Sequence, residues 1–329
     1  MRTQTTPERA QANGSTVALA PPDRRQAGRP WAPAHAGRGV TRHSAAGDVV
    51  MAYIGTQADR LKALDPLVRK NAPDSVHQMR VAARRLRSMM QAYPAVLPKP
   101  ATEHLRAELK WLGEVLSEAR DNEVLSDYLM TRLASLPAEQ VLGPAQARTR
   151  GHFAPREASE RETLLEAMNS ARYYALLAEV DRLLADPPLT AAAAQPAAKV
   201  LPRAIDRTYR RTRRRMRHAQ RTVPGPGRDA ALHETRKAAK RARYAAEAAE
   251  PALGRKADRF ARRMKAVQSA LGDQHDAVNA RAAAREIGVR AHLAGENAFT
   301  FGLLGERAAR DAAAYEAKAQ KAWKHVKQL

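Results

Sequence analysis

The sequence has 329 residues, no cysteine and a formal net charge of +23 at pH 7. Without cysteine it offers no disulfide, thiolate catalysis or cysteine-ligated metal, and no apolar run approaches the ~18 residues of a membrane span. A positive charge of this size indicates a polyanionic partner and says little about fold. With 44% hydrophobic but 5% aromatic residues, the composition favours helices packed through small side chains. No apolar signal segment opens the sequence, so we expect a cytoplasmic protein without membrane insertion.

The N-terminal region combines two contrasting segments. Residues 1–45 are rich in Gly, Pro, Arg, Gln and Thr without hydrophobic periodicity, which is typical of a disordered basic arm. Apolar positions then predict a helix over about 47–70. Pro73-Asp74-Ser75 ends the connection, and Ser75 followed by Gln78 matches the capping-box pattern that begins a helix.

The helix after Ser75 carries the first of two matching stretches, residues 76–87. Its apolar positions step by three and four residues, as on the buried face of an α-helix. A second stripe, shifted roughly 100° around the helix, consists of His77, Arg80, Arg84 and Arg87, with Arg85 beside it. The basic stripe therefore borders the buried face. His77 lies in the first turn, where exposed N–H groups favour anions.

The middle of the sequence predicts further helices. One covers about 102–120, and a second begins at Asp121 as its cap and ends near 136. A looser Pro/Gly stretch follows, and then one long helix over about 155–185. Residues 187–197, with Pro187-Pro188 and a run of alanines, predict a linker between a first repeat, 46–186, and a second repeat, 198–329.

The second repeat opens with the most charged helix of the chain, over about 198–221. Its arginines step by four and three residues along one face: Arg203, Arg207, Arg210, Arg214, Arg217 and Arg221. After a Pro-Gly turn, Asp229 is the predicted N-cap of the helix with the second matching stretch, residues 232–243. This stretch contains His233, Arg236, Lys237, Lys240, Arg241 and Arg243. Helices over about 255–271, 276–287, with Asp276 as a cap, and 296–328 complete the chain.

The two stretches share one pattern, apolar-His-x-x-Arg-x-Ala-Ala-(Arg/Lys)-Arg-x-Arg. A repeat at this separation indicates two copies of a domain-sized unit. We therefore predict an all-α protein of two tandem, pseudo-symmetric helical bundles with four or more helices each. A basic stripe on one amphipathic helix is commonly a solvated face. Here the single sign of charge, the opening histidine and the recurrence in register favour an anion-binding groove.

Sequence patterns for catalysis and metal binding are missing. The sequence contains no nucleophile elbow, P-loop or His-Glu-x-x-His, and its carboxylates are scattered rather than clustered for Mg²⁺ or base catalysis. His233, His275 and Asp273 are weak metal candidates, because cationic neighbours oppose a divalent ion. We expect no enzyme activity, cofactor or metal. Arginine and lysine instead pair with phosphate oxygens, and cations about 5 Å apart along a helix can follow a linear polyanion.

The repeated histidine pattern, the Leu-Gly and Arg-Asp segments at 271–272 and 120–121, and the arginine-rich helix resemble the CHAD domain, the conserved-histidine α-helical domain. The resemblance covers about residues 45–327. It implies a pair of four-helix bundles with a basic cavity or groove between them. It also implies binding of inorganic polyphosphate, in some members on polyphosphate or polyhydroxyalkanoate granules. Many relatives carry an additional triphosphate-metabolising CYTH module with a Glu-x-Glu-x-Lys signature, which this sequence lacks.

The resemblance implies anion-binding roles for His77, Arg80, Arg84, Arg87, His233, Arg236, Lys240 and Arg243, with Lys237 and Arg241 as neighbours. The predicted polyphosphate-binding set further includes Arg85, Arg203, Arg207, Arg210, Arg214 and Arg217. Because the second half carries more of the charge, we expect substitutions at 233–243 and 203–217 to weaken binding more than substitutions at 77–87.

Two other functions are alternatives to noncatalytic polyphosphate binding. Nonspecific nucleic-acid binding at low salt is expected at this net charge, through the arginine-rich helix and the basic arm. Few aromatic residues are available, however, to stack on single-stranded bases. An enzyme acting on phosphoanhydrides is the less favoured alternative. Association with storage granules is supported only by the resemblance.

Overall fold

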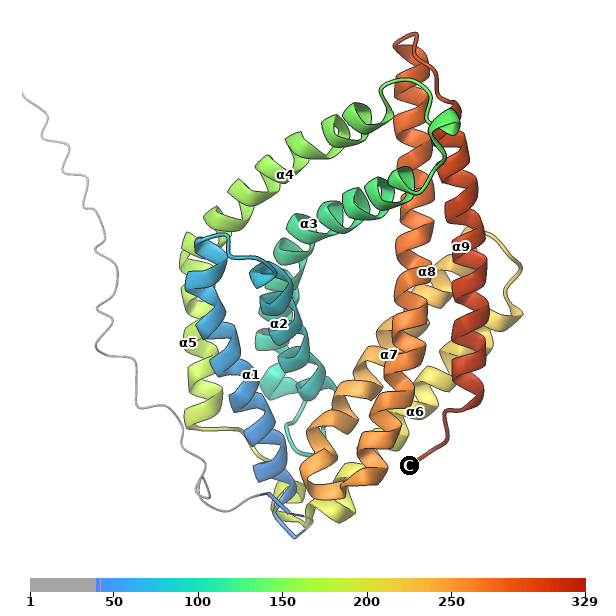
Figure 1. Ribbon diagram of the computed structural model, residues 1–329. Helices are drawn as coiled ribbons and strands as arrows, with labels where there is room; N and C mark the ends of the chain where they lie inside the picture. The colour runs from blue at the N-terminus through green and yellow to red at the C-terminus, as the bar shows by residue number, and fades with distance from the viewer. Residues whose placement is uncertain (1–39, 42) are drawn as a thin grey trace, which may run out of the picture. The chain divides into compact units, whose positions relative to one another are not determined.

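A computed structural model describes residues 40–41 and 43–329 (Figure 1). Within this range the chain forms α-helices joined by turns and short 3-10 helices, and it contains no β-strand. The predicted all-α class is therefore confirmed. The predicted basic arm lies outside the described residues except for 40, 41 and 43–45. Among the described helices, none has an apolar stretch long enough to span a bilayer.

The α-helices follow one another along the chain with mostly short connections. Their bounds are α1 Ala46–Arg69, α2 Ser75–Ala92, α3 Glu103–Ala134, α4 Ala145–Asn169, α5 Ala171–Ala185, α6 Ala197–Arg221, α7 Pro226–Leu253, α8 Arg255–Leu293 and α9 Phe299–Lys324. The predictions for α1 and α6 are confirmed to within one residue at each end. The last predicted helix is also found, although α9 begins and ends inside its predicted range.

Two predicted helix breaks are wrong. The sequence predicts caps at Asp121 and Asp276, but α3 and α8 run through both positions without interruption. An aspartate inside a helix costs less than ~1 kcal/mol relative to alanine. Buried leucines before and after Asp121, such as Leu116 and Leu129, hold α3 together across this position. The result is two unbroken helices that each reach two regions of the fold.

The expected capping box at the start of α2 is also wrong. Asp74 occupies the N-cap position with a φ of 59° and makes no side-chain cap. The Ser75 hydroxyl donates to the Ala72 carbonyl at 2.6 Å, and the Gln78 amide donates to the Asp74 carboxylate at 3.2 Å. Because the preceding turn uses the Ser75 hydroxyl, this side chain does not cap the helix.

Asp229 is not the N-cap of α7, contrary to the prediction. The helix begins earlier, at Pro226, a residue that suits the first helical position because it lacks an N–H group. Asp229 therefore lies inside the first turn. Its carboxylate accepts a hydrogen bond from the Gln274 amide of α8 at 2.8 Å.

The long helix predicted over 155–185 is two helices, α4 and α5. Ser170 separates them with an extended backbone, and its side-chain oxygen accepts a hydrogen bond from the Tyr173 N–H at 3.2 Å. This is a serine N-cap that the apolar periodicity conceals. Pro155, the predicted start, lies inside α4, which begins ten residues earlier at Ala145.

Two hydrophobic cores hold the helices together. The first gathers side chains from α1, α2, α5, α6 and α7 with the N-terminal parts of α3 and α8 and the C-terminal parts of α4 and α9. The second lies where the C-terminal parts of α3 and α8 meet α4 and α9. Both cores contain residues of both predicted repeats, so neither repeat buries its apolar surface alone.

The segment between the predicted repeats is packed against the first repeat. It contains the short helix η4 (Ala191–Ala194), in which Ala193 is buried. A Cβ on Gly47 of α1 would lie only 3.2 Å from the Ala193 Cβ, so glycine permits this close approach. The Thr190 N–H donates to the Val96 carbonyl at 3.0 Å, and further backbone hydrogen bonds join the segment to the residues just before α1.

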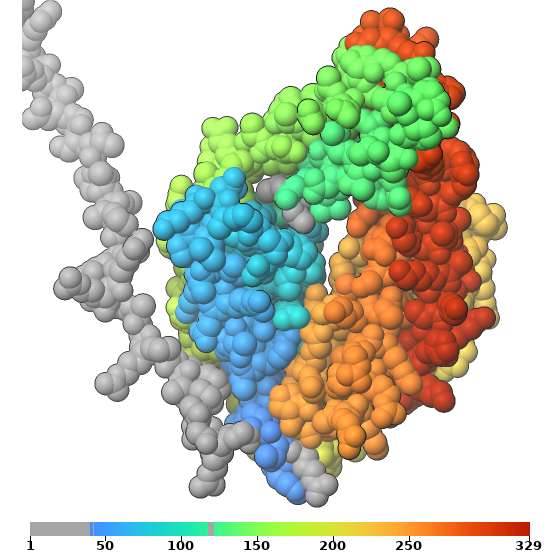
Figure 2. Space-filling model, in the orientation of Figure 1, coloured from blue at the N-terminus to red at the C-terminus, as the bar shows by residue number. Residues whose placement is uncertain are grey.

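The first three helices of each half pack in the same order. α2 contacts α1 and α3, α7 contacts α6 and α8, and α2 and α7 contact each other across the halves. In Figure 2 the surface is hollowed between the cyan segment and the orange segment, which contain α2 and α8. A duplication would produce the same packing order in both halves. The duplication and the repeat boundaries stay predictions from the sequence.

Candidate anion-binding site

The two matching stretches lie on α2 and α7, where they line two adjoining cavities. The larger cavity, of about 540 Å³, lies among α2, α3, α7 and α8. The smaller cavity, of about 380 Å³, lies among α2, α3 and α7. Five side chains line both cavities and are called here the shared wall: Arg80, Arg84, His233, Arg236 and Lys240. The structure thus brings residues of both stretches to one place.

The other predicted residues of the two stretches border one cavity each. Three line the larger cavity: His77, Arg85 and Arg243. Three line the smaller cavity: Arg87, Lys237 and Arg241. All but Lys237, which is exposed, are partly buried. The stripes reach the cavities because positions three and four residues apart lie on one side of a helix.

The predicted arginines of α6 do not line these cavities. They are all exposed: Arg203, Arg207, Arg210, Arg214 and Arg217. At 100° per residue they lie roughly opposite the packed face of α6, which contains Leu201, Ile205 and Met216. Of the other arginines on this helix, Arg211 and Arg215 act electrostatically on Arg241 and so lie nearer the smaller cavity.

Two arginines at the larger cavity are held by one carboxylate. Glu247 accepts hydrogen bonds from Arg85 of α2 at 3.3 Å and from Arg243 of α7 at 2.6 Å. Both guanidinium groups lie 5.3 Å from the centre of the Tyr244 ring, and the Tyr244 hydroxyl accepts a hydrogen bond from Arg84 at 3.2 Å. These contacts fix cations of both stretches around one aromatic residue.

Sequence reasoning misses Tyr244, Glu247 and Gln268, which accepts a hydrogen bond from Arg243 at 2.9 Å. The spacing of Arg243 and Glu247 by four residues does indicate an ion pair on one helix. The contact of Glu247 with Arg85 joins segments far apart in the sequence, so no local pattern predicts it.

The cations of the shared wall repel one another, and the clearest effect is on Lys240. Burial, together with Arg236, Arg84 and Arg80, lowers the pKa of Lys240 to about 6, while Asp276 acts in the opposite direction. Burial and nearby arginines also lower the pKa of Arg241, to about 10. In the empty site, burial and the neighbouring arginines therefore disfavour the charged form of Lys240, and an anion beside it would favour that form.

A pair of histidine rings lies at the edge of the shared wall. The rings of His233 and His275 are 4.2 Å apart between centroids, and His275 Nε2 lies 3.4 Å from the Asn279 amide nitrogen. Burial, followed by Lys237, Arg236 and Lys240, lowers the pKa of His233. Within the part of the chain that the structure describes, no three His, Asp or Glu side chains gather as metal ligands would.

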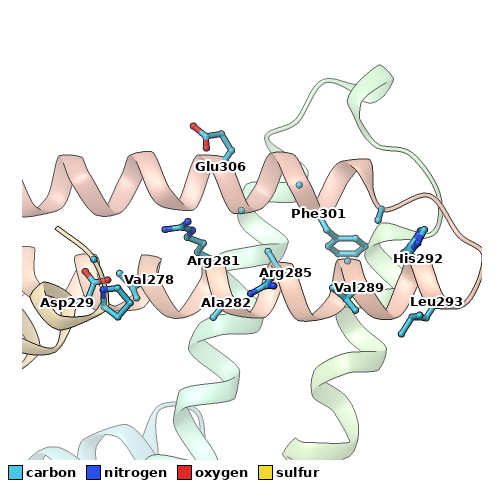
Figure 3. Close-up of a pocket in the computed structure, with 17 residues that line it drawn as sticks. Asp229, Val278, Arg281, Ala282, Arg285, Val289, His292, Leu293, Phe301 and Glu306 are labelled. Atoms are coloured by element: carbon cyan, nitrogen blue, oxygen red, sulfur yellow. The ribbon is translucent and has the colours of Figure 1, made fainter.

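A third cavity, of about 1140 Å³, lies between α8 and α9, away from the two basic cavities, and its lining has different chemistry (Figure 3). Its lining is mainly apolar, with Val289, Leu293 and Phe301 among the side chains shown. Arg281 and Arg285 are its arginines, and none of the predicted anion-binding residues borders it. This cavity lacks the convergence of cations that a polyanion requires.

The fold and the cavities define a helical protein with a cleft lined by cations of both matching stretches. The family model of the CHAD domain matches residues 52–285, and the chain belongs to the CHAD domain family.

Two solved structures share the fold. PptA from Streptomyces chartreusis is 24% identical with a TM-score of 0.72, over 85% of this chain and 100% of that one. The CHAD domain from the plant Ricinus communis is also 24% identical, with a TM-score of 0.68, over 88% of this chain and 96% of that one.

Two curated relatives come from Mycobacterium tuberculosis. The uncharacterized protein Rv2226 of strain H37Rv is 34% identical over 265 residues, which cover 80% of this chain and 50% of the relative. The uncharacterized protein MT2285 of strain CDC 1551 matches with the same identity and coverage. The chain therefore spans about half the length of the curated relatives it matches.

Proposed function

We propose that this protein binds inorganic polyphosphate, without catalysis, in the two adjoining cavities between α2 and α7. The shared wall carries this proposal, because cations from two distant stretches converge there on one partly buried surface. Membership in the CHAD family supports a role related to polyphosphate.

The chemistry of the wall favours holding a phosphate chain. Each guanidinium can form two parallel, charge-assisted hydrogen bonds with phosphate oxygens. Among the described lining residues, the carboxylates are Asp276 at the larger cavity and Glu114 at the smaller one, on different helices. Because phosphoryl chemistry uses grouped carboxylates to hold Mg²⁺ or to act as a base, this arrangement supports binding rather than cleavage.

The test is a titration with polyphosphate of defined chain length. We expect replacing the four cations of the wall by glutamine, Arg80→Gln, Arg84→Gln, Arg236→Gln and Lys240→Gln, to weaken binding about 100-fold or more, since each charge-assisted hydrogen bond contributes about 1.5–3 kcal/mol. The matched control replaces four exposed arginines of α6: Arg203→Gln, Arg207→Gln, Arg210→Gln and Arg214→Gln. We expect the control to lose less than about tenfold, because exposed charges act weakly.

Equal losses in the two variants would contradict the proposal, because net charge and not the wall would then control binding. Circular dichroism of both variants checks that the helices remain. A phosphate-release assay with Mg²⁺ or Mn²⁺ tests the noncatalytic part, and we expect no turnover.

The exposed arginine face of α6 favours nonspecific nucleic-acid binding as a second candidate function. Competition separates the two functions. Duplex DNA and polyphosphate are compared at equal phosphate concentration and at several salt concentrations. We expect polyphosphate to displace DNA, and displacement of polyphosphate by DNA would favour the second candidate.

Granule association is a further part of the proposal, because a polyphosphate-binding protein would concentrate where the polymer is stored. The tagged protein is imaged beside a dye for polyphosphate and a dye for lipid. We expect overlap with the polyphosphate dye that is lost in the glutamine variant of the wall.

A further inference from the structure

Lys240 is surrounded by charges on several helices. Arg236 lies one turn before it on α7, Arg80 and Arg84 approach from α2, and Asp276 approaches from α8. His233, also on α7, interacts with it electrostatically. From α3, the smaller cavity receives Lys110 and Glu114. Among the described residues Lys240 is in no salt bridge. Its side chain is partly buried, and the neighbours that act on it are three arginines and the carboxylate of Asp276.

We infer that Lys240 is a specificity-determining residue that is neutral in the empty site and takes up one proton from solvent when a densely charged phosphate chain enters. The new N–H bond turns the amine into an ammonium group, which donates hydrogen bonds to phosphate oxygens. This inference rests on the proposed function, because it concerns the same site.

The electrostatics of the wall supply the driving force. Burial and the three arginines lower the pKa of Lys240 to about 6, so the empty site at pH 7.5 contains mostly the neutral amine. Phosphate oxygens near Nζ favour the charged form and raise this pKa. At pH values between the pKa of Lys240 in the empty site and its pKa in the occupied site, binding takes up one proton. In that range, lowering the pH by one unit raises the affinity for polyphosphate about tenfold. The rise from Lys240 levels off below about pH 6.

His233 responds in the same direction at lower pH. Burial and the cations Lys237, Arg236 and Lys240 lower its pKa in the empty site, and its ring contacts that of His275 from α8. A bound phosphate favours the imidazolium form of His233. Its contribution begins below the ordinary pKa of histidine, about 6.5, and so adds to binding at mildly acidic pH.

A neutral Lys240 discriminates between ligands by charge density. Successive phosphates of inorganic polyphosphate carry charges with no sugar between them, so several charges meet the wall at once. Nucleic acids and single phosphate groups place fewer charges there and hold the proton on Lys240 less strongly. We therefore expect the protein to prefer polyphosphate over nucleic acids and single phosphate groups at neutral pH. This preference should decrease toward pH 6, where Lys240 is protonated before binding.

Isothermal titration calorimetry at pH 7.5, in buffers of different ionisation enthalpy, measures the protons taken up. Long-chain polyphosphate is the probe, because its end groups, which titrate near neutral pH, are few. We expect net uptake by the wild type and its loss in Lys240→Met. In Lys240→Arg, binding should persist without uptake, because the guanidinium is always charged. The control Lys256→Met, at an exposed position of α8 that borders neither basic cavity, should keep the wild-type uptake.

Two results would overturn the inference while leaving polyphosphate binding intact. One is tight binding by the wild type with no proton uptake, and the other is unchanged uptake in Lys240→Met. The same titration is repeated with duplex DNA. A ratio of polyphosphate affinity to DNA affinity that does not change between pH 7.5 and 6 would also contradict the role of Lys240 in specificity. No binding of polyphosphate at any pH would instead reject the proposed function itself.

Discussion

Lys240 and Arg243 lie three residues apart on α7, yet their surroundings give them different roles. Arg243 shares Glu247 with Arg85 and so helps to hold α2 against α7. Among the described residues Lys240 is in no salt bridge, and burial and its cationic neighbours lower its pKa. A cation that is paired inside the protein mainly supports the structure, whereas one without a carboxylate is available to a ligand and reduces stability while the site is empty.

We expect Lys240→Met to stabilise the empty protein by about 1–4 kcal/mol at pH 7, because folding of the wild type at this pH removes the proton that the unfolded chain holds on Lys240. The unfolded chain binds a proton on Lys240 up to its ordinary pKa of about 10.4, but the folded chain loses it above about pH 6. Wild-type stability therefore gains from rising pH between these values, and the advantage of Lys240→Met shrinks toward pH 10.

Urea unfolding at pH 6, 7, 8 and 9.5 measures this difference. Lys237→Met is the control, because Lys237 is exposed and pairs with Glu234 on the same helix, and we expect it to change stability by less than about 0.5 kcal/mol. An advantage of Lys240→Met that is constant across this pH range would contradict the prediction.

At the scale of helices, the angle between the basic stripe and the apolar stripe decides whether the cations face a cavity or solvent. On α2 and α7 the two stripes are adjacent, so the cations border the buried face and reach the cavities. On α6 the arginines lie opposite the packed face and remain in solvent. This angular difference is present in the sequence, and it leads us to expect a smaller role for the predicted arginines of α6 than their number indicates.

Other features of the helices were not accessible from local patterns. Asp121 and Asp276 resemble caps, and only packing on both sides keeps α3 and α8 continuous. Ser170 ends one helix inside a run of periodic leucines. The meeting of Arg84 with Tyr244 requires α2 to contact α7, which depends on the tertiary fold. The sequence predicted which faces of α2 and α7 carry cations, but not what holds those cations in place.

The continuity of α8 fixes the spacing of the site. Its 39 residues extend about 58 Å at 1.5 Å per residue. The helix enters the first core near Phe260 and the second at Ala280, and before the second core it supplies His275 and Asp276 to the larger cavity. A rigid helix held at both ends keeps these two side chains at a constant distance from α7.

We expect Ala282→Pro to weaken polyphosphate binding although Ala282 borders neither basic cavity. Proline inside a helix costs about 3 kcal/mol and kinks it, and this kink would fall just after the site, where α8 enters the second core at Ala280. Ala309→Pro in α9 is the control, with a similar cost in stability but no kink in α8. Binding titrations and thermal unfolding of both variants check this, and equal affinities would show that α8 need not be straight.

At the scale of the whole molecule, net charge and the site act together. The chain carries +23, and its self-repulsion opposes the folded state until a polyanion neutralises part of it. A ligand that binds only the folded state stabilises it by about 2.7 kcal/mol at 100 times its Kd.

We therefore expect long-chain polyphosphate at this level to raise Tm by roughly 5 °C or more, since about 1 kcal/mol shifts a chain of this size by 2–4 °C. Differential scanning fluorimetry measures the shift. Raising the salt from 50 to 500 mM should reduce it, because ions screen the attraction. Orthophosphate at equal phosphate concentration is the control and should produce little shift, and a salt-independent effect of polyphosphate would contradict an electrostatic site.

The packed segment between the two halves has a consequence for assembly. Halves joined by a loose tether can exchange between two copies of a chain and form a domain-swapped dimer. Here Ala193 and Thr190 anchor the tether to the first half, and both cores combine residues of the two halves. Exchange would require opening both cores and releasing the tether at once, so we expect each chain to keep its own halves and to build its basic cavities from a single polypeptide.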